Sequence, residues 1–171
     1  MSWKKEISQI KLREKLAKQQ GGADAVNIQH SKGRLTLRER IDLLLDNDTF
    51  EEIGKVAGGA EYDDDGELSS LTPANFILGF GKIDNREIII GGEDFTVKGG
   101  SPNAAGLRKS VYTEDLAVKH KFPLVRLHEG GGGSVAGPSK DKPGYGGDPV
   151  FSRSRFKSVA DTLKEVPVVS A

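Results

Sequence analysis

A run of four glycines is the feature of this sequence best suited to chemistry. Residues 124–129 read Leu-Val-Arg-Leu-His-Glu, an apolar strand pattern, and the glycines at 130–133 follow directly. Because glycine has no Cβ and tolerates positive φ angles, such a run can turn successive backbone N–H groups toward one point. The residues therefore predict an anion or oxyanion site at the end of a strand, with a flexible loop as the alternative interpretation.

A second glycine cluster occupies the same kind of place. Gly99-Gly100-Ser101 follows a hairpin pattern formed by residues 76–80 and 88–90, and it precedes an expected helix at about 104–120. A strand at 123–127 comes next, so strand and helix patterns alternate. This alternation predicts an α/β domain with a largely buried sheet. In such sheets ligand sites gather at the carboxyl ends of strands, which favours a functional interpretation of both clusters.

The first sixty residues have the pattern of a scaffold. Apolar residues recur at three- and four-residue spacings, which predicts an amphipathic helix packed on another element; they are Trp3, Ile7 and Ile10, then Leu12 and Leu16. Thr36 and Glu39 have the spacing of a capping box and mark the start of a second, shorter helix. One face of that helix is expected to carry Leu37, Ile41, Leu44 and Leu45.

The last forty residues predict one more helix and one more strand. Asp148 is the expected N-cap and Pro149 the first residue of the helix. Its apolar stripe would be Phe156, Val159, Ala160 and Leu163. A buried strand is expected from about Val166, and the sequence stops at Ala171. We therefore expect the sequence to be a fragment.

Several familiar glycine motifs are matched only in part. Residues 131–136 have the spacing of a dinucleotide fingerprint, but Pro138 and Pro143 would break the helix that must follow it. The P-loop spacing at 132–137 lacks the Lys-Ser/Thr that holds phosphate and magnesium. Residues 132–136 only approximate a serine hydrolase elbow, and residues 128–132 echo a lipase-type oxyanion loop, so an esterase stays open as a minor alternative.

Composition argues against several other classes of protein and of site. Lys plus Arg and Asp plus Glu both count 25, so the formal net charge is zero and neither a nucleic-acid partner nor a membrane partner is indicated. Cys is absent, which removes disulfides, thiol catalysis and Cys-based zinc sites. His128-Glu129 lacks the second His of a zinc helix, so no metal is expected. Without a secretory signal, the chain is predicted to be cytoplasmic, or mitochondrial if a presequence has been removed.

An ordered set of segments gives the chain a family resemblance. These are Lys32-Gly33-Arg34-Leu35-Thr36 through Asp46, Phe50-Glu51-Glu52, residues 94–101 and residues 129–133. Their order and approximate spacing resemble the carboxyltransferase (β) subunits of biotin-dependent acyl-CoA carboxylases, of the propionyl-CoA and methylcrotonyl-CoA type. The absence of Cys argues against the bacterial acetyl-CoA carboxylase β subunit, whose zinc ribbon needs four.

The resemblance implies a fold and a set of site residues. It implies a crotonase-like fold in which residues 1–171 form the N-terminal carboxyltransferase domain, incomplete, with a second carboxyltransferase domain beyond Ala171. The family's oxyanion Gly-Gly, which stabilises the enolate of an acyl-CoA thioester, falls on Gly131-Gly132. Glu129 then takes the family's Asp position and Gly133 its Ala position. Gly99, Gly100 and Ser101 fall on a segment that lines the acyl-CoA and biotin cavity.

The resemblance also implies cofactors and partners. Biotin would arrive on a partner carrier domain, from a biotin carboxylase/biotin carboxyl carrier subunit, and the carboxyltransferase subunits would form a homo-oligomer. Ser134 and Val135 depart from the family pattern in a segment that shapes the acyl pocket, so the acyl group is left open. The chain alone is expected to be inactive. A non-catalytic crotonase-like CoA-binding module and an inactive fragment are the alternatives.

Overall fold

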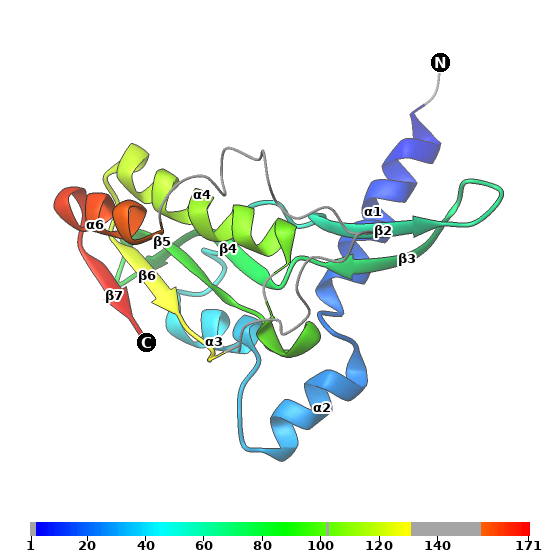
Figure 1. Ribbon diagram of the computed structural model, residues 1–171, viewed down its shortest axis with the longest axis horizontal. Coiled ribbons are helices and arrows are strands. Elements are labelled where there is room, and N and C mark those ends of the chain that lie inside the picture. Colours follow the sequence, from blue (N-terminus) through cyan, green and yellow to red (C-terminus); the bar gives the residue numbers. More distant parts are fainter. Residues whose placement is uncertain (1–2, 102, 131–154) are drawn as a thin grey trace.

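The computed structural model describes residues 3–101, 103–130 and 155–171, and Figure 1 shows the arrangement of the elements. The elements in chain order are α1 (Lys4–Lys18), α2 (Ala23–Ser31), α3 (Leu37–Leu44), β1 (Glu51–Glu52), β2 (Gly58–Tyr62), β3 (Leu68–Pro73), β4 (Phe76–Ile83), β5 (Arg86–Glu93), the 3₁₀ turn η1 (Lys98–Gly100), α4 (Ala104–His120), β6 (Leu124–Leu127), α6 (Arg155–Glu165) and β7 (Val168–Ser170). The predicted hairpin and the helix over 104–120 are confirmed, and the strand predicted over 123–127 forms as β6.

A five-stranded mixed sheet organises the chain, in the order β1-β4-β5-β6-β7. The pairs β1–β4 and β4–β5 are antiparallel, whereas β5–β6 and β6–β7 are parallel. Strands β2 and β3 form a separate hairpin, which projects beside α1 in Figure 1. The predicted α/β class is confirmed.

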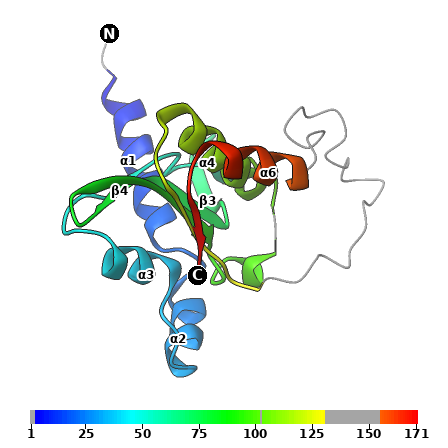
Figure 2. The same ribbon diagram turned by 90° about the vertical axis from the view of Figure 1, so that its left-hand side faces the viewer.

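Helices cover both faces of the sheet, as the turned view in Figure 2 shows. On one face α3 contributes to a core made of Leu37, Ile41, Leu45, Ile77, Ile88, Ile90, Val125 and Leu127. On the other face α4 contributes to a second core made of Phe76, Leu78, Ile89, Leu116, Ala117, Leu124 and Val166. The strands β4, β5 and β6 are therefore buried on both sides, which matches their nearly continuous apolar sequences.

The capping box predicted at the start of α3 is confirmed. The Glu39 amide donates to the Thr36 hydroxyl oxygen at 3.4 Å, and the Thr36 amide donates to the Glu39 carboxylate at 2.7 Å. That backbone donor, with a second hydrogen bond from His30, holds the pKa of Glu39 below its usual value. Leu37 and Ile41 are buried beside it, whereas Leu44 is 39% exposed.

Two predicted apolar stripes do not face the core. In α1, Trp3, Ile7 and Ile10 are 66%, 50% and 52% exposed, and only Ala17 is buried. In α6, Val159 and Leu163 are 39% and 57% exposed. Among residues 157–165, the part of α6 whose side chains the structure describes, the buried side chains are polar and belong to Ser158 and Thr162. The predicted helix start at residues 148–149 lies outside the described residues.

The last predicted strand forms, but it is less buried than expected. β7 forms and pairs with β6, but its side chains are half-buried or exposed, and Val169 is 56% exposed. The prediction of a buried strand was therefore wrong, because β7 is the outermost strand of the described sheet. Among the described residues, no helix combines the length and the hydropathy needed to cross a bilayer.

Removing the cap should weaken the attachment of α3. We expect Thr36→Ala to lower the free energy of unfolding by about 1 kcal/mol, because the Glu39 amide loses its acceptor in a site where Thr36 is 2% exposed. Urea denaturation followed by circular dichroism measures the change. Thr36→Ser keeps the hydroxyl and is the matched control. Equal losses in the two variants would show that the methyl group, and not the cap, is responsible.

Candidate functional site

The candidate site lies where β5 and β6 end. Because the two strands are parallel and Gly92 pairs with Leu127, their carboxyl ends meet at one edge of the sheet. η1 follows β5 in the chain, and Gly130, the first glycine of the run, follows β6. Figure 2 shows the end of β6 beside the green turn η1, and α3 reaches this edge through the side chain of Arg40, which contacts Glu129. Gly99-Gly100 and Gly130 therefore follow neighbouring strand ends, as the alternating pattern predicts, whereas Gly131, Gly132 and Gly133 lie outside the described residues.

The Gly99 turn has a backbone that favours glycine. Lys98, Gly99 and Gly100 all have positive φ, at 52°, 62° and 72°. The Gly100 amide donates to the Val97 carbonyl at 3.1 Å, and the amide of residue 101 donates back to Lys98 at 3.2 Å. Among the described residues, nothing would crowd a Cβ on Gly99, so backbone conformation alone explains the glycine at this position.

Asn75 clamps this turn from the start of β4. Its side-chain amide donates to the carbonyls of Gly100, at 3.0 Å, and Ser101, at 2.8 Å. Its side-chain oxygen accepts from the Asn103 amide at 3.3 Å, and Asn103 in turn caps α4 at Gly106. A Cβ on Gly106 would lie 2.0 Å from the Asn75 side-chain oxygen. The turn, the start of α4 and β4 are thus fixed by one buried amide.

A cluster of charges surrounds the strand ends. Arg40, from α3, lies 3.3 Å from the Glu129 carboxylate and 3.4 Å from the His128 carbonyl. Glu93, the last residue of β5, accepts from the Glu129 amide at 3.4 Å and lies 3.3 Å from the His128 imidazole. Sequence reasoning missed Arg40, because nothing in the pattern of α3 shows that its partner lies 89 residues away.

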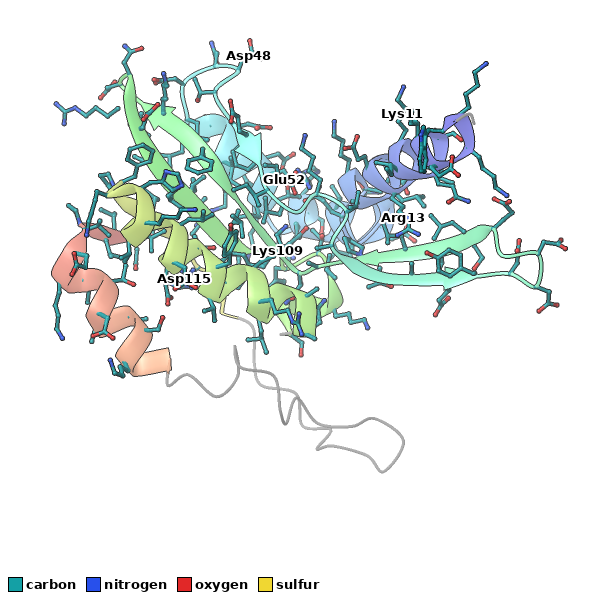
Figure 3. The ribbon with its side chains drawn as sticks, turned by 90° about the horizontal axis from the view of Figure 1, so that it is seen from above. Lys11, Arg13, Asp48, Glu52, Lys109 and Asp115 are labelled. Carbon is teal, nitrogen blue, oxygen red and sulfur yellow. The ribbon has the colours of Figure 1, made fainter. Side chains whose placement is uncertain are left out.

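A second charged cluster is buried between β1, α3 and α4. Glu52 receives both guanidinium nitrogens of Arg38, at 2.8 and 3.2 Å, and Lys109 lies 3.9 Å from the same carboxylate. Figure 3 shows Glu52 and Lys109 facing one another across the ribbon. Burial lowers the pKa of Lys109 from 10.5 to about 8, although Glu52 opposes the shift. Val111 lies on the buried side of α4, and polar residues share that side.

Asp94, which follows β5 directly, belongs to the same region. Burial raises the pKa of its carboxyl, whereas the Thr96 hydroxyl and amide, which both donate to it, act in the opposite direction. The Thr96 hydroxyl also accepts from the Gly21 amide, so Asp94 and Thr96 anchor the α1–α2 connection to the turn. In the described part of the chain, no group of three or more His, Asp or Glu side chains is arranged to hold a metal ion.

The structure locates only part of the predicted site. Gly99, Gly100 and Ser101 lie at the carboxyl edge, with Gly99 exposed and Gly100 buried. Gly131, Gly132 and Gly133 lie outside the described residues. Gly130 follows β6, and a Cβ there would meet open space as far as the described residues are concerned. The assignment of Gly131-Gly132 to the oxyanion pair stays a prediction.

Comparison with known proteins shows to which protein family the chain belongs. The family described as carboxyl transferase domain matches residues 28–152, which is most of the chain. The propionyl-CoA carboxylase beta chain of Roseobacter denitrificans is 31% identical over 154 residues, covering 89% of this chain and 29% of that protein. The chain thus spans about three tenths of the length of this relative.

Solved structures agree with this result. A single-chain, multi-domain long-chain acyl-CoA carboxylase aligns over 96% of this chain and 17% of its own, with a TM-score of 0.71 and 25% identity. The transcarboxylase 12S hexamer with methylmalonyl-coenzyme A bound aligns over 96% of this chain and 28% of its own, with a TM-score of 0.65 and 24% identity. The chain belongs to the carboxyl transferase domain family and has the crotonase-like fold of these proteins.

Loss of the Asn75 clamp should destabilise the chain. We expect Asn75→Ala to lower the free energy of unfolding by about 1–3 kcal/mol, since it leaves the Gly100 and Ser101 carbonyls and the Asn103 amide without their partner. Asn47→Ala, at an exposed turn, is the control and should change stability by less than about 0.5 kcal/mol. Urea denaturation compares the two, and equal stabilities would contradict the clamp.

Lys109 should make stability depend on alkaline pH. Its pKa is about 8 in the folded chain and 10.5 in the unfolded reference, so between these values the unfolded state binds more protons and stability rises with pH. We therefore expect Lys109→Met to be more stable than the parent at pH 7, by at most about 3 kcal/mol, and this advantage to shrink toward pH 10. Denaturation at pH 7, 8.5 and 10 measures it.

The control for Lys109 lies on the exposed side of the same helix. Lys119→Met should stay within about 0.5 kcal/mol of the parent at all three pH values. An advantage of Lys109→Met that stays constant with pH would mean that its ammonium is not the cause.

Proposed function

We propose that this chain binds an acyl-CoA thioester and stabilises its enolate during carboxyl transfer, as part of a biotin-dependent acyl-CoA carboxylase. The observation that carries the proposal is the family match over 28–152, which includes both glycine clusters. The meeting of β5 and β6 at one edge supports it, because ligands bind at the carboxyl ends of strands in sheets of this kind.

In the proposed reaction the α-carbon of the thioester loses a proton and the thioester oxygen becomes an enolate. The amides of Gly131 and Gly132 would donate to that oxygen, and Gly99, Gly100, Ser101 and Gly133 would line the acyl-CoA cavity. Carboxybiotin, carried by a partner, would supply the carboxyl group and accept the α-proton. This assignment needs no side-chain base in the chain and no metal ion.

The same resemblance leads us to propose partners. In enzymes of this type the N–H pair that holds the biotin ureido oxygen belongs to a second domain, and active sites form between subunits. The 12S transcarboxylase, for example, is described as a hexamer. We therefore propose that residues 1–171 work with a second carboxyltransferase domain, a biotinyl carrier and further copies of the subunit. The compartment proposed is the cytoplasm or the mitochondrial matrix.

Binding and transfer separate this proposal from its alternatives. Calorimetric titration of the 171-residue chain with propionyl-CoA should show binding, while carboxyl transfer from a biotinylated carrier should be absent. The chain can then be combined with the second domain and the carrier. If it still binds propionyl-CoA but no carboxyl group is transferred, a non-catalytic CoA-binding module is favoured. Failure to bind any short acyl-CoA would favour an inactive fragment.

Removing one donor tests the oxyanion assignment. We expect Gly132→Pro, which has no N–H, to weaken binding of propionyl-CoA by about tenfold, because one hydrogen bond to the thioester oxygen is lost. Carboxyl transfer in the assembled enzyme should fall by about 10²–10³. Gly132→Ala keeps the N–H and is the matched control. Equal effects of the two substitutions would point to steric blockage and contradict the donor role.

A further inference from the structure

We propose that a second copy of this chain packs its β2–β3 hairpin against the outer face of α1. The outer face is the side of the helix that the chain's own hairpin leaves uncovered, and it is made of Trp3, Ile7, Ile10, Lys4, Lys11 and Lys18. The contact needs no acyl-CoA, so it can be tested separately from the proposed function.

Helix α1 and the hairpin lie side by side and have almost no core of their own. In α1 only Ala17 is buried, and no residue of β2 or β3 is buried. The hairpin forms a separate two-stranded sheet, and Figure 1 shows it projecting beside α1. In water an isolated hairpin is marginally stable, and so is a helix of 15 residues. We therefore expect both elements to gain from a further contact.

Within one copy, the hairpin covers one side of α1. The Lys5 ammonium lies 2.7 Å from the Glu67 carboxylate, and the Arg13 guanidinium lies 5.6 Å from the centre of the Tyr62 ring. Residues two apart in an α-helix point in nearly opposite directions. Figure 3 accordingly shows Arg13 on the side of α1 that faces the hairpin and Lys11 on the other side. In the described part of the chain, that other side is left without a partner element.

The outer face combines apolar and cationic side chains. Its three apolar residues follow one another at four- and three-residue spacings, so they share one side of the helix, and each is at least 50% exposed. Its three lysines are seven residues apart and form a row along this apolar stripe. Residues 3–18 contain six Lys or Arg and two Glu, a net charge of +4. Such a face suits a partner that brings both negative charge and an apolar group.

The end of the hairpin has the complementary chemistry. Residues 61–67 contain five Asp or Glu and no Lys or Arg, a net charge of −5, and all seven are exposed. Tyr62, which is 49% exposed, adds an aromatic ring. The Asp63 carboxylate accepts from the amides of Asp65 and Glu67, which holds the loop in shape. Among the described residues, the carboxylates of Asp64 and Asp65 have no partner, so they are available to a second chain.

Charge favours a second copy as the occupant of the outer face. A patch of +4 attracts a loop of −5, whereas two α1 helices, or two hairpin ends, would repel one another. The hairpin and the outer face are different patches of one chain, so a copy can offer the first and receive on the second. An anionic membrane fits less well, because the acidic hairpin beside α1 would be repelled by the same surface.

Trp3 reports directly on the contact because it is the only Trp of the chain. We expect sedimentation velocity of the 171-residue chain to show association as its concentration rises from about 1 to 300 µM. Over the same range Trp3 fluorescence should shift to shorter wavelength, because the indole ring leaves water. A chain that stays monomeric, or that associates while Trp3 stays in water, would overturn the proposal.

Charge reversal identifies the two surfaces. Lys4→Glu/Lys11→Glu and Asp64→Lys/Asp65→Lys should each weaken association at least about tenfold, because like charges then meet. The variant that combines all four substitutions should recover to within about threefold of the parent, because opposite charges meet again. Asp63 is kept because its carboxylate holds the loop. A combined variant that stays as weak as the two separate variants would overturn the proposal.

Matched controls separate docking from net charge. Lys32→Glu/Lys119→Glu makes the same change of net charge at exposed positions outside α1 and the hairpin, and it should associate like the parent. Adding Asp64→Lys/Asp65→Lys to this control restores the net charge of the parent without restoring the pairing, so association should stay weak. Recovery in this variant, or loss in the first control, would overturn the proposal. The hairpin variants decide the matter even if charge reversal in α1 unfolds the helix, which circular dichroism detects.

Discussion

The parallel pairing of β5 with β6 is the constraint on which the rest of the structure depends. Its register, from Ile89 opposite Leu124 to Gly92 opposite Leu127, ends both strands at one edge. Parallel neighbours need a crossover, and α4 provides it across the sheet face that carries the second core. As a result two segments about thirty residues apart in the sequence emerge side by side. Each segment contains glycines, and the candidate site is the edge of the sheet at which both strands end.

The opposite face of the sheet serves the same edge through α3. Leu37 and Ile41 anchor the helix in the core. Arg40, on another side of the helix, contacts the His128 carbonyl just beyond the end of β6. In this short segment the apolar residues pack into the core, the capping box fixes the start of the helix, and Arg40 contacts the residues beyond β6. The segment is also part of the ordered resemblance and of the region that matches the family.

Much of the fold was predictable because its signals are local. The hairpin of β4 and β5, the 104–120 helix and the Thr36 capping box all follow from residue types at short spacing. The stripes of α1 and α6 failed because periodicity shows which residues share a face and not what covers that face. In α6 the buried face uses Ser158, which donates to Glu114, so a hydrogen bond takes the place of an apolar contact. The contacts of Asn75 and Arg40 were beyond reach for the same reason, since their partners lie 25 to 131 residues away.

Polar groups buried under α4 explain why that helix can act as a fixed support. Arg126 in the middle of β6 donates to the carbonyl and hydroxyl of Ser110, lies 3.7 Å from the Glu114 carboxylate, and stacks 5.1 Å from the Phe76 ring. Such a buried pair adds little net stability, but any shift of α4 along the sheet would leave a buried charge uncompensated, which is costly. Apolar contacts alone would tolerate such a shift more easily. Because Asn103 begins α4 and hydrogen-bonds to Asn75, a helix held in register over β6 also holds the Gly99 turn in place. The polar interior and the candidate site are therefore parts of one arrangement.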